Sequence, residues 1–330
     1  MQYQFLGSTG VRVSSLGFGT MSFGGDADEQ TSAQLFHRCR EAGINLFDTA
    51  NVYQKGRSEE ILGKLIHDCR NEVVIASKAY FPMGEGPNDR GASRYHIMHS
   101  VEGSLRRLGT DRIDLYYVHR FDDMTAIGDT LTTLDILVRQ GKILYPAVSN
   151  FAAWQVEKML GVAARRELVP PVAIQPMYNL AKRQAEVEIL PMAQANSLAV
   201  IPYSPLGGGL LSGKYGRADR PSSGRLMDNR MYQTRYGDDR VYEVAERFRE
   251  LAAEWGHHPV SLAVAWVASH PAVTAPLIGA RSLTQLEPAL AAAEIQLTAE
   301  QRAEVSALSE APPPATDRNE ESSDNNFGAR

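Results

Sequence analysis

Four side chains have the types and the order along the chain that proton transfer requires. Asp48, Lys78 and His119 each follow a short apolar run that predicts a β-strand. Tyr53 lies in the loop that follows Asp48. If these strands are parallel neighbours, their carboxyl ends meet at one rim and the four side chains converge. A phenol, an ammonium, a carboxylate and an imidazole in one place predict proton donation to a substrate oxygen.

The expected proton donor of this group is the phenol of Tyr53. A phenol has an ordinary pKa of about 10, and the nearby ammonium of Lys78 would lower that value. Asp48 would fix Lys78 through an ion pair. His119 would donate to a carbonyl oxygen or relay a proton to Tyr53. None of these side chains supplies electrons, so a reduction would require a cofactor. Taken singly, each residue type is more often a cap, a solvated cation or a packing residue, and only their joint order favours catalysis.

The elements that must position these residues alternate along the chain. A hairpin is expected first, with Tyr3-Gln4-Phe5 and Val11-Arg12-Val13 as its strands. Helical segments then separate eight strand-like runs, many of them apolar on both faces as buried parallel strands are. This pattern predicts an α/β fold, a (β/α)8 TIM barrel with an N-terminal β-hairpin, and the alternative is a doubly wound open sheet. The eight runs are 16–19, 44–47, 73–77, 113–118, 143–148, 172–175, 198–202 and 275–278.

Helices are expected between and after these strands. Ser58 is the expected N-cap of one helix, and Gly43, Gly109 and Gly141 stand where three others should stop. The segment 207–240 is expected to be a long loop. The predicted helices are 30–42, one beginning at Ser58, 93–108, 125–140, 152–165, 183–196, 241–254, 260–269, 283–293 and 298–309.

The net charge and the distribution of charged and apolar residues favour a globular protein without a nucleic-acid or membrane partner. The net charge is −5 with both signs interspersed, and no basic run or long apolar run is present. The amino terminus lacks an apolar signal core, so a cytoplasmic location is expected. Cys39 and Cys69 lack C-x-x-C spacing and are predicted to be free thiols. We predict one domain over 1–310, a flexible tail over 311–330 and no metal site, and a homo-oligomer is left open.

Longer motifs around these residues resemble the aldo-keto reductase family, over about residues 1–295. The chain is similar to bacterial members and to the potassium-channel β-subunits. The resemblance implies a (β/α)8 barrel that binds NADPH without a Rossmann domain. Accordingly, neither Gly17-Phe18-Gly19 nor Gly207-Gly208-Gly209 continues as G-x-G-x-x-G. The motifs are Phe47–Tyr53, Ser58–Gly63, Ser104–Leu115, Val148–Phe151 and Tyr203–Gly207.

The resemblance also implies a cofactor site. Ser149, Asn150 and Gln175 would hold the nicotinamide carboxamide, and Tyr203 would stack on the nicotinamide ring. Arg281 would bind the 2′-phosphate of NADPH (NADP+ after turnover), because its fork binds phosphate bidentately, and NADH is the alternative donor. The implied catalytic tetrad is Asp48, Tyr53, Lys78 and His119. The implied cofactor-binding residues are Gly19, Thr20, Met21, Asp48, Ser149, Asn150, Gln175, Tyr203, Ser204, Leu206, Gly208, Ser212, Lys214, Gly279, Arg281 and Gln285.

Some positions depart from the family pattern or bear on the substrate. Pro288 and Ala289 replace a Glu and an Asn that reach the adenine, so weaker adenine binding is expected. Pro146 lies in a central strand and predicts a local distortion. Arg120 and Arg235 would meet an anionic substrate or form ion pairs. The expected lining of the substrate pocket is Met21, Phe23, Tyr80, Phe81, Phe121, Met231 and Tyr232.

Three functions fit these observations. The first is NADPH-dependent reduction of a small aldehyde or ketone, with Tyr53 as the general acid. The second is oxidation of a sugar or polyol by the same machinery. The third is a nucleotide-sensing regulatory module, like the channel β-subunits, and the histidine at position 119 argues against it.

Overall fold

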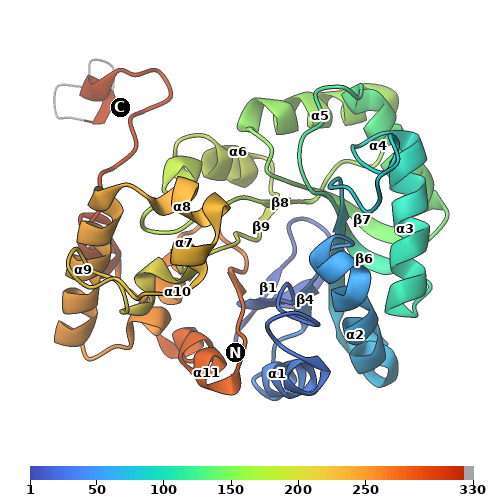
Figure 1. The fold of residues 1–330 in the computed structure, drawn as a ribbon. Helices are drawn as coiled ribbons and strands as arrows, with labels where there is room; N and C mark the ends of the chain where they lie inside the picture. The colour runs from blue at the N-terminus through green and yellow to red at the C-terminus, as the bar shows by residue number, and fades with distance from the viewer. Residues whose placement is uncertain (323–330) are drawn as a thin grey trace.

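The computed structural model describes residues 1–322, and its centre is a barrel of eight parallel strands (Figure 1). The hydrogen-bonded order is β10-β3-β4-β5-β6-β7-β8-β9. Backbone bonds between the two ends of this sheet close it: Thr274 N donates to Val200 O over 2.8 Å, and Leu277 N donates to Pro202 O over 2.9 Å. The barrel prediction is confirmed, and the open-sheet alternative is wrong. The strands are β3 Gly17–Gly19, β4 Leu46–Asp48, β5 Val74–Ala79, β6 Ile113–Val118, β7 Ile143–Ser149, β8 Ala173–Gln175, β9 Ala199–Val200 and β10 Leu277–Ile278.

The N-terminal hairpin, β1 Tyr3–Phe5 and β2 Arg12–Ser14, closes one end of this barrel. Leu6 and Val13 are fully buried and belong to the same apolar cluster as the inward-facing side chains of the barrel strands. Gly7 fits there because it has φ of +56°, and a Cβ would lie 2.9 Å from two backbone oxygens next to β8 and β9. The plugged end is therefore the end where the strands begin.

Helices surround the barrel and bury a second apolar layer against its outer face (Figure 1). Large buried side chains such as Phe36, Phe47 and Trp266 fill this layer. The α-helices are α1 Glu29–Glu41, α2 Arg57–Ile66, α3 Arg94–Leu108, α4 Ile127–Arg139, α5 Ala153–Arg166, α6 Ile189–Ala195, α7 Arg225–Asp228, α8 Arg230–Tyr236, α9 Asp239–Glu254, α10 Pro259–Ala268, α11 Leu283–Leu290 and α12 Ala299–Ser306. The 3-10 turns are η1 Tyr53–Gly56, η2 His67–Glu72, η3 Gln184–Glu186, η4 Gly207–Ser212, η5 Ala291–Glu294 and η6 Asn319–Ser322.

Four sequence predictions about local structure are wrong. The segment 207–240 is not one loop, because it forms η4, α7 and α8. Gly56 rather than Ser58 precedes α2, because the Ser58 hydroxyl turns inward and donates to Thr20 O over 2.7 Å. The helix expected over 183–196 divides into η3 and α6. β7 runs unbroken through Pro146, whose carbonyl still accepts from Val172 N.

The structure bears on two further predictions, the state of the cysteines and the lack of a long apolar run. Cys39 and Cys69 are free, as predicted, and burial raises the pKa of both thiols. Within residues 1–322, none of the helices has the length and apolar character to cross a bilayer. The single domain over 1–310 stays a prediction, and residues 323–330 of the expected tail lie outside the described residues.

Candidate active site

The structure brings the four proposed catalytic side chains together at the open end of the barrel. Asp48 ends β4, Lys78 lies in β5, His119 directly follows β6 and Tyr53 begins η1. Lys78 is fully buried and Asp48 is 2% exposed. Strand alternation explains the convergence, because Lys78 has the same inward parity as Ala76 in the barrel interior.

The ammonium of Lys78 is the centre of this cluster. It donates to Asp48 Oδ1, to Thr49 O over 2.8 Å and to the phenolic oxygen of Tyr53 over 3.5 Å. The second carboxylate oxygen of Asp48 accepts from Gln175 Nε2 over 2.8 Å. Both oxygens of Asp48 therefore have donors, which makes a buried ion pair at this depth tolerable.

The turn that carries Tyr53 has an unusual backbone. Gln54 and Lys55 have φ of 48° and 54°, and Gly56 has φ of 96°. Two consecutive non-glycine residues in the left-handed region cost free energy, of order 1–3 kcal/mol each. Such a turn persists only when its surroundings hold it in place.

A buried ion pair behind the turn supplies that support. The side chain of Arg107 packs so closely against Gly56 that a Cβ there would lie 2.7 Å from Arg107 Cδ. Arg107 Nε donates to Glu59 Oε2 over 2.7 Å, and Ser77 Oγ donates to Glu59 Oε1 over 2.6 Å. Ser77 precedes Lys78 on β5, so this network ties α2 and α3 to the strand that carries the ammonium. Sequence reasoning missed Glu59 and Arg107 as supports.

His119 completes the cluster as a buried, neutral imidazole. Its ring centroid lies 6.1 Å from that of Tyr53 and 4.9 Å from that of Phe81. Burial, reinforced by the Lys78 ammonium, holds the pKa of His119 well below its ordinary value. Its Nδ1 atom is buried and has no hydrogen-bond partner among residues 1–322. Because Nδ1 is shielded from solvent, a substrate oxygen would approach the other ring nitrogen, Nε2.

The acid–base state of Tyr53 differs in one respect from the sequence prediction. Burial raises the pKa of the phenol, and the opposing effect of Lys78 is smaller, so the net shift is upward. Burial lowers the pKa of Lys78, but Asp48 and Tyr53 outweigh it and raise the pKa of the ammonium overall. At neutral pH the phenol and the ammonium both keep their protons. Tyr53 thus has the protonation state of an acid rather than that of a base.

The next strand ends extend the cluster around the rim. Ser149 Oγ donates to Gln175 O over 2.9 Å, and Asn150 Nδ2 donates to His119 O over 3.0 Å. The phenol of Tyr203 donates to Asn150 Oδ1 over 2.8 Å. All four residues proposed for the nicotinamide therefore lie in one bonded network with the catalytic cluster. They offer hydroxyl, amide and aromatic groups, a set that suits a carboxamide on an aromatic ring.

The remaining residues of the implied cofactor site follow β3 and β9. Ser204, Leu206 and Ser212 are half-buried in and before η4, and Lys214 is exposed after it. Gly208 is sterically required, since it has φ of +71° and a Cβ would lie 2.5 Å from the ring of Tyr232.

Beyond β3, Gly19 is half-buried and Met21 is exposed. Thr20 differs from both: it is fully buried, with its hydroxyl bonded to Asp48 O and Ser58. Its hydroxyl is therefore not free for a ligand.

The implied phosphate end carries surplus positive charge. Arg281 Nη1 and Arg225 Nη2 lie 3.8 Å and 3.7 Å from the same oxygen of Asp26. Two guanidinium groups share one carboxylate there, so the residues present suit a phosphate. Sequence reasoning missed Arg225, which begins a helix where a loop was expected.

The implied adenine end lies along α11. Gln285 Oε1 accepts from Arg281 N over 3.1 Å, and Gly279 is exposed beside it. Pro288 lies inside α11 and its carbonyl accepts from Ser261 Oγ over 2.6 Å. Ala289 is buried.

The residues expected to line the substrate pocket lie in different environments in the structure. The prediction that Phe23 lines the pocket is wrong, because this side chain is fully buried and packs against Phe18 with ring centroids 5.8 Å apart. Tyr80 contacts Phe81, which contacts His119. Phe121 packs edge-on against neighbouring aromatic rings, whereas Met231 is exposed.

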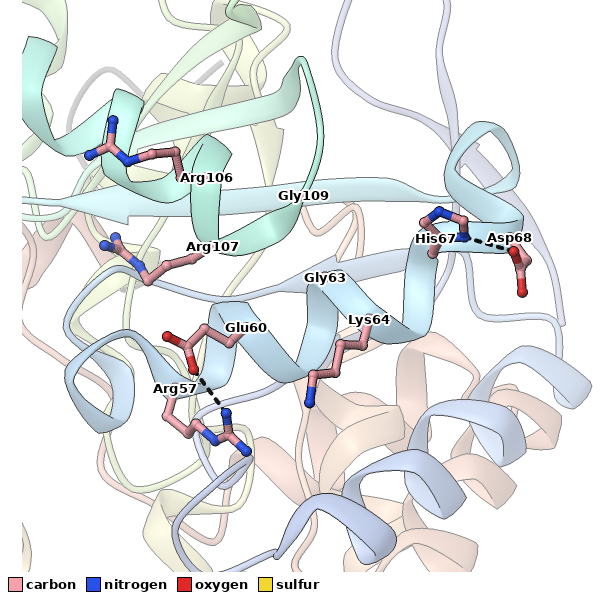
Figure 2. A pocket seen from close by; sticks show the side chains of 9 residues that line it. All are labelled: Arg57, Glu60, Gly63, Lys64, His67, Asp68, Arg106, Arg107 and Gly109. Atoms are coloured by element: carbon pink, nitrogen blue, oxygen red, sulfur yellow. Dashed lines mark hydrogen bonds and ion pairs between the residues drawn. The ribbon is translucent and has the colours of Figure 1, made fainter.

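A groove of about 690 Å³ lies elsewhere, between α2 and α3 (Figure 2). Its charged side chains spread along the groove and do not converge on one point (Figure 2). Arg57 pairs with Glu60 and His67 pairs with Asp68. The groove contains no member of the proposed catalytic cluster.

The barrel and its rim agree with the sequence comparisons. The chain belongs to the aldo/keto reductase family, whose sequence profile matches residues 15–310. It is 40% identical over 314 residues to "Uncharacterized oxidoreductase YrpG" of Bacillus subtilis (strain 168), covering 91% of this chain and 93% of that protein. It is 37% identical over 293 residues to "Probable voltage-gated potassium channel subunit beta" of Oryza sativa subsp. japonica, covering 87% and 89% of the two chains. The protein of the same name from Arabidopsis thaliana is 35% identical over 302 residues, with 89% and 92% covered. These relationships make the chain an oxidoreductase of the aldo/keto reductase type.

Proposed function

We propose that this protein reduces a small aldehyde or ketone to an alcohol with NADPH, and that Tyr53 is the general acid. The observation that carries the proposal is the bonded chain of Asp48, Lys78 and Tyr53, with the imidazole ring of His119 edge-on to the Tyr53 ring. That arrangement aims a protonated phenol and an imidazole at one place, which suits a carbonyl oxygen that becomes an alcohol.

Each side chain has a defined task in this reaction. Tyr53 gives its proton to the carbonyl oxygen as the alcohol forms, and the ammonium of Lys78 stabilises the phenolate that remains. Asp48 keeps that ammonium charged and in position. His119 stays neutral and orients the carbonyl oxygen through one ring nitrogen. NADPH supplies the hydride when it is bound, since no side chain here can.

The donor set at the rim supports a nicotinamide cofactor. Ser149, Asn150 and Gln175 would hold the carboxamide, and Tyr203 would offer its ring face. Arg281 and Arg225 would bind the 2′-phosphate or the pyrophosphate, and this positive charge favours NADPH over NADH.

Two other functions use the same residues. Oxidation of a sugar or polyol is the reverse reaction, with Tyr53 as the base. It would require deprotonation of a phenol whose pKa is raised, and this favours reduction at neutral pH. A regulatory role has support from the relatives named as channel subunits. In that role the site would bind the nucleotide and turn over slowly.

Nucleotide binding followed by turnover tests the proposal. Titration with NADPH should quench protein fluorescence at micromolar concentrations, and NADH should require higher concentrations. A panel of aldehydes should then oxidise the bound NADPH, measured by its absorbance in stopped flow. Binding without turnover of any aldehyde would favour the regulatory role, and absence of binding by both nucleotides would refute the proposal.

Replacement of Arg281 by Ala tests the cofactor preference. We expect the Kd for NADPH to rise about 10-fold or more and the Kd for NADH to change by less than about threefold, because charge-assisted bonds to phosphate are lost. Fluorescence titration measures both values. Arg12→Ala, at an exposed position on the hairpin at the opposite end of the barrel, is the matched control. Equal weakening of both nucleotides would remove Arg281 from the 2′-phosphate.

A further inference from the structure

Arg235 on α8 is a half-buried cation without a carboxylate partner. No ion pair or hydrogen bond joins its guanidinium to another residue in the described part of the chain, 1–322. The guanidinium lies over the ring of Tyr232, whose centroid is 5.5 Å from Arg235 Cζ and also 5.5 Å from Arg225 Cζ. The sequence left open whether Arg235 forms an ion pair or meets a substrate, and the structure favours the second option.

The acidic residues nearest to Arg235 in the chain are engaged elsewhere. Asp228 accepts from Gly224 N over 2.8 Å. Asp238 pairs with Arg240 at 2.7 Å, and Asp239 pairs with Arg220 at 2.5 Å. The positive charge of Arg235 is thus left uncompensated by the acids next to it. A partly desolvated cation without a counterion attracts an anion from solution.

Arg235 lies beside the turn that follows Tyr203, at the edge of the proposed active site. Tyr232, beneath its guanidinium, packs against the glycine turn that follows Tyr203, where a Cβ on Gly208 would lie 2.5 Å from the Tyr232 ring. Tyr232 also stacks on Tyr236, with ring centroids 6.5 Å apart.

The electrostatics agree with this placement. Arg235 acts against the burial that raises the pKa of Tyr203 to about 12, and Tyr53 acts on the same phenol. The guanidinium therefore lies near the phenol of Tyr203, whose hydroxyl donates to Asn150 at the rim.

We infer that Arg235 selects substrates that carry an oxyanion, a carboxylate or a phosphate, in addition to the carbonyl group. The planar guanidinium can bind either oxyanion bidentately, and it lies over the ring of Tyr232. A substrate of this class would place its carbonyl toward Tyr53 and its charge toward α8. The inference rests on the proposed reductase function and adds the substrate class.

Matched pairs of aldehydes test this inference with the NADPH-loaded enzyme. The first pair is 4-carboxybenzaldehyde and its neutral methyl ester, and the second is glyceraldehyde 3-phosphate and glyceraldehyde. The pair with the larger preference identifies which oxyanion the site takes. We expect kcat/KM to favour the charged member of at least one pair by about 10- to 100-fold, mainly through KM.

The variant Arg235→Gln should abolish this preference and leave the neutral aldehydes unchanged within about twofold, and Arg235→Lys should restore part of it. Arg230→Gln, an exposed arginine on the same helix, is the control and should keep the preference.

Three outcomes would overturn the inference: no preference in the wild type, equal losses for charged and neutral substrates in Arg235→Gln, or a raised Kd for NADPH in that variant. In each case reduction of the neutral aldehydes by wild type would leave the proposed function intact. Failure of all four aldehydes with bound NADPH would instead refute the function itself.

Discussion

Tyr53→Phe is expected to lower kcat for aldehyde reduction by about 10²–10⁴-fold. The substitution removes the proton donor but keeps the ring that lies edge-on to His119. Lys78 and Asp48 keep their ion pair, so the Kd for NADPH should stay within about twofold of the wild-type value. Single-turnover kinetics at saturating NADPH measure the chemical step directly.

A matched control separates this effect from a general loss of a hydroxyl group. Tyr95 is 72% exposed on α3 and belongs to none of the proposed site residues, so Tyr95→Phe should leave kcat unchanged. Turnover in Tyr53→Phe equal to that of the wild type would assign the acid role to His119 or to a water. A lost kcat together with lost NADPH binding would indicate a disrupted site.

Lys78→Met is expected to lower the free energy of unfolding by about 3–5 kcal/mol, because it leaves the carboxylate of Asp48 buried without its counterion. The free energy should recover toward wild type in the double variant Lys78→Met/Asp48→Asn, in which no charge remains buried. Activity should be lost in both variants. Urea unfolding followed by fluorescence measures the first effect, and the aldehyde assay measures the second.

The surface of the protein offers a control for this prediction. Lys64 pairs with Glu29 in an exposed position, and Lys64→Met should cost less than about 1 kcal/mol. An unfolding free energy of Lys78→Met within 1 kcal/mol of the wild type would mean that Asp48 takes up a proton or reaches water at low cost. If the double variant is no more stable than Lys78→Met, the loss of unfolding free energy comes from altered packing around residue 78 and not from the buried carboxylate.

The sequence was sufficient to predict the barrel because its strand signals are local. Apolar runs such as Ile113–Val118 and the helix-ending glycine Gly109 are visible without any knowledge of distant contacts. The segment 207–240 was misread because its helices are short and polar. They are held against η4 by Tyr232 and Tyr236, which is a tertiary effect.

The side chains that form the candidate site could be predicted from the sequence. The residues that support the Tyr53 turn and the direction of the Tyr53 pKa shift could not. Asp48, Lys78 and His119 could be identified because parallel strands bring their carboxyl ends to one rim. The support of the Tyr53 turn by Arg107 depends on contacts across about 50 residues of sequence, and no local pattern encodes it. The direction of the Tyr53 pKa depends on how burial compares with the nearby ammonium, and composition does not give that balance.

The N-terminal hairpin closes the end of the barrel opposite the proposed active site. Leu6 and Val13 fill the end where the strands begin, so in the described part of the chain, 1–322, water would approach the Lys78–Asp48 ion pair from the rim that carries Tyr53 and His119. A ligand bound across that rim would therefore exclude bulk solvent from the Lys78–Asp48 ion pair. Its field on the Tyr53 proton would then strengthen, because the local dielectric constant falls as water leaves. Because the hairpin closes the opposite end of the barrel, binding of a ligand at the rim would by itself change the acidity of Tyr53.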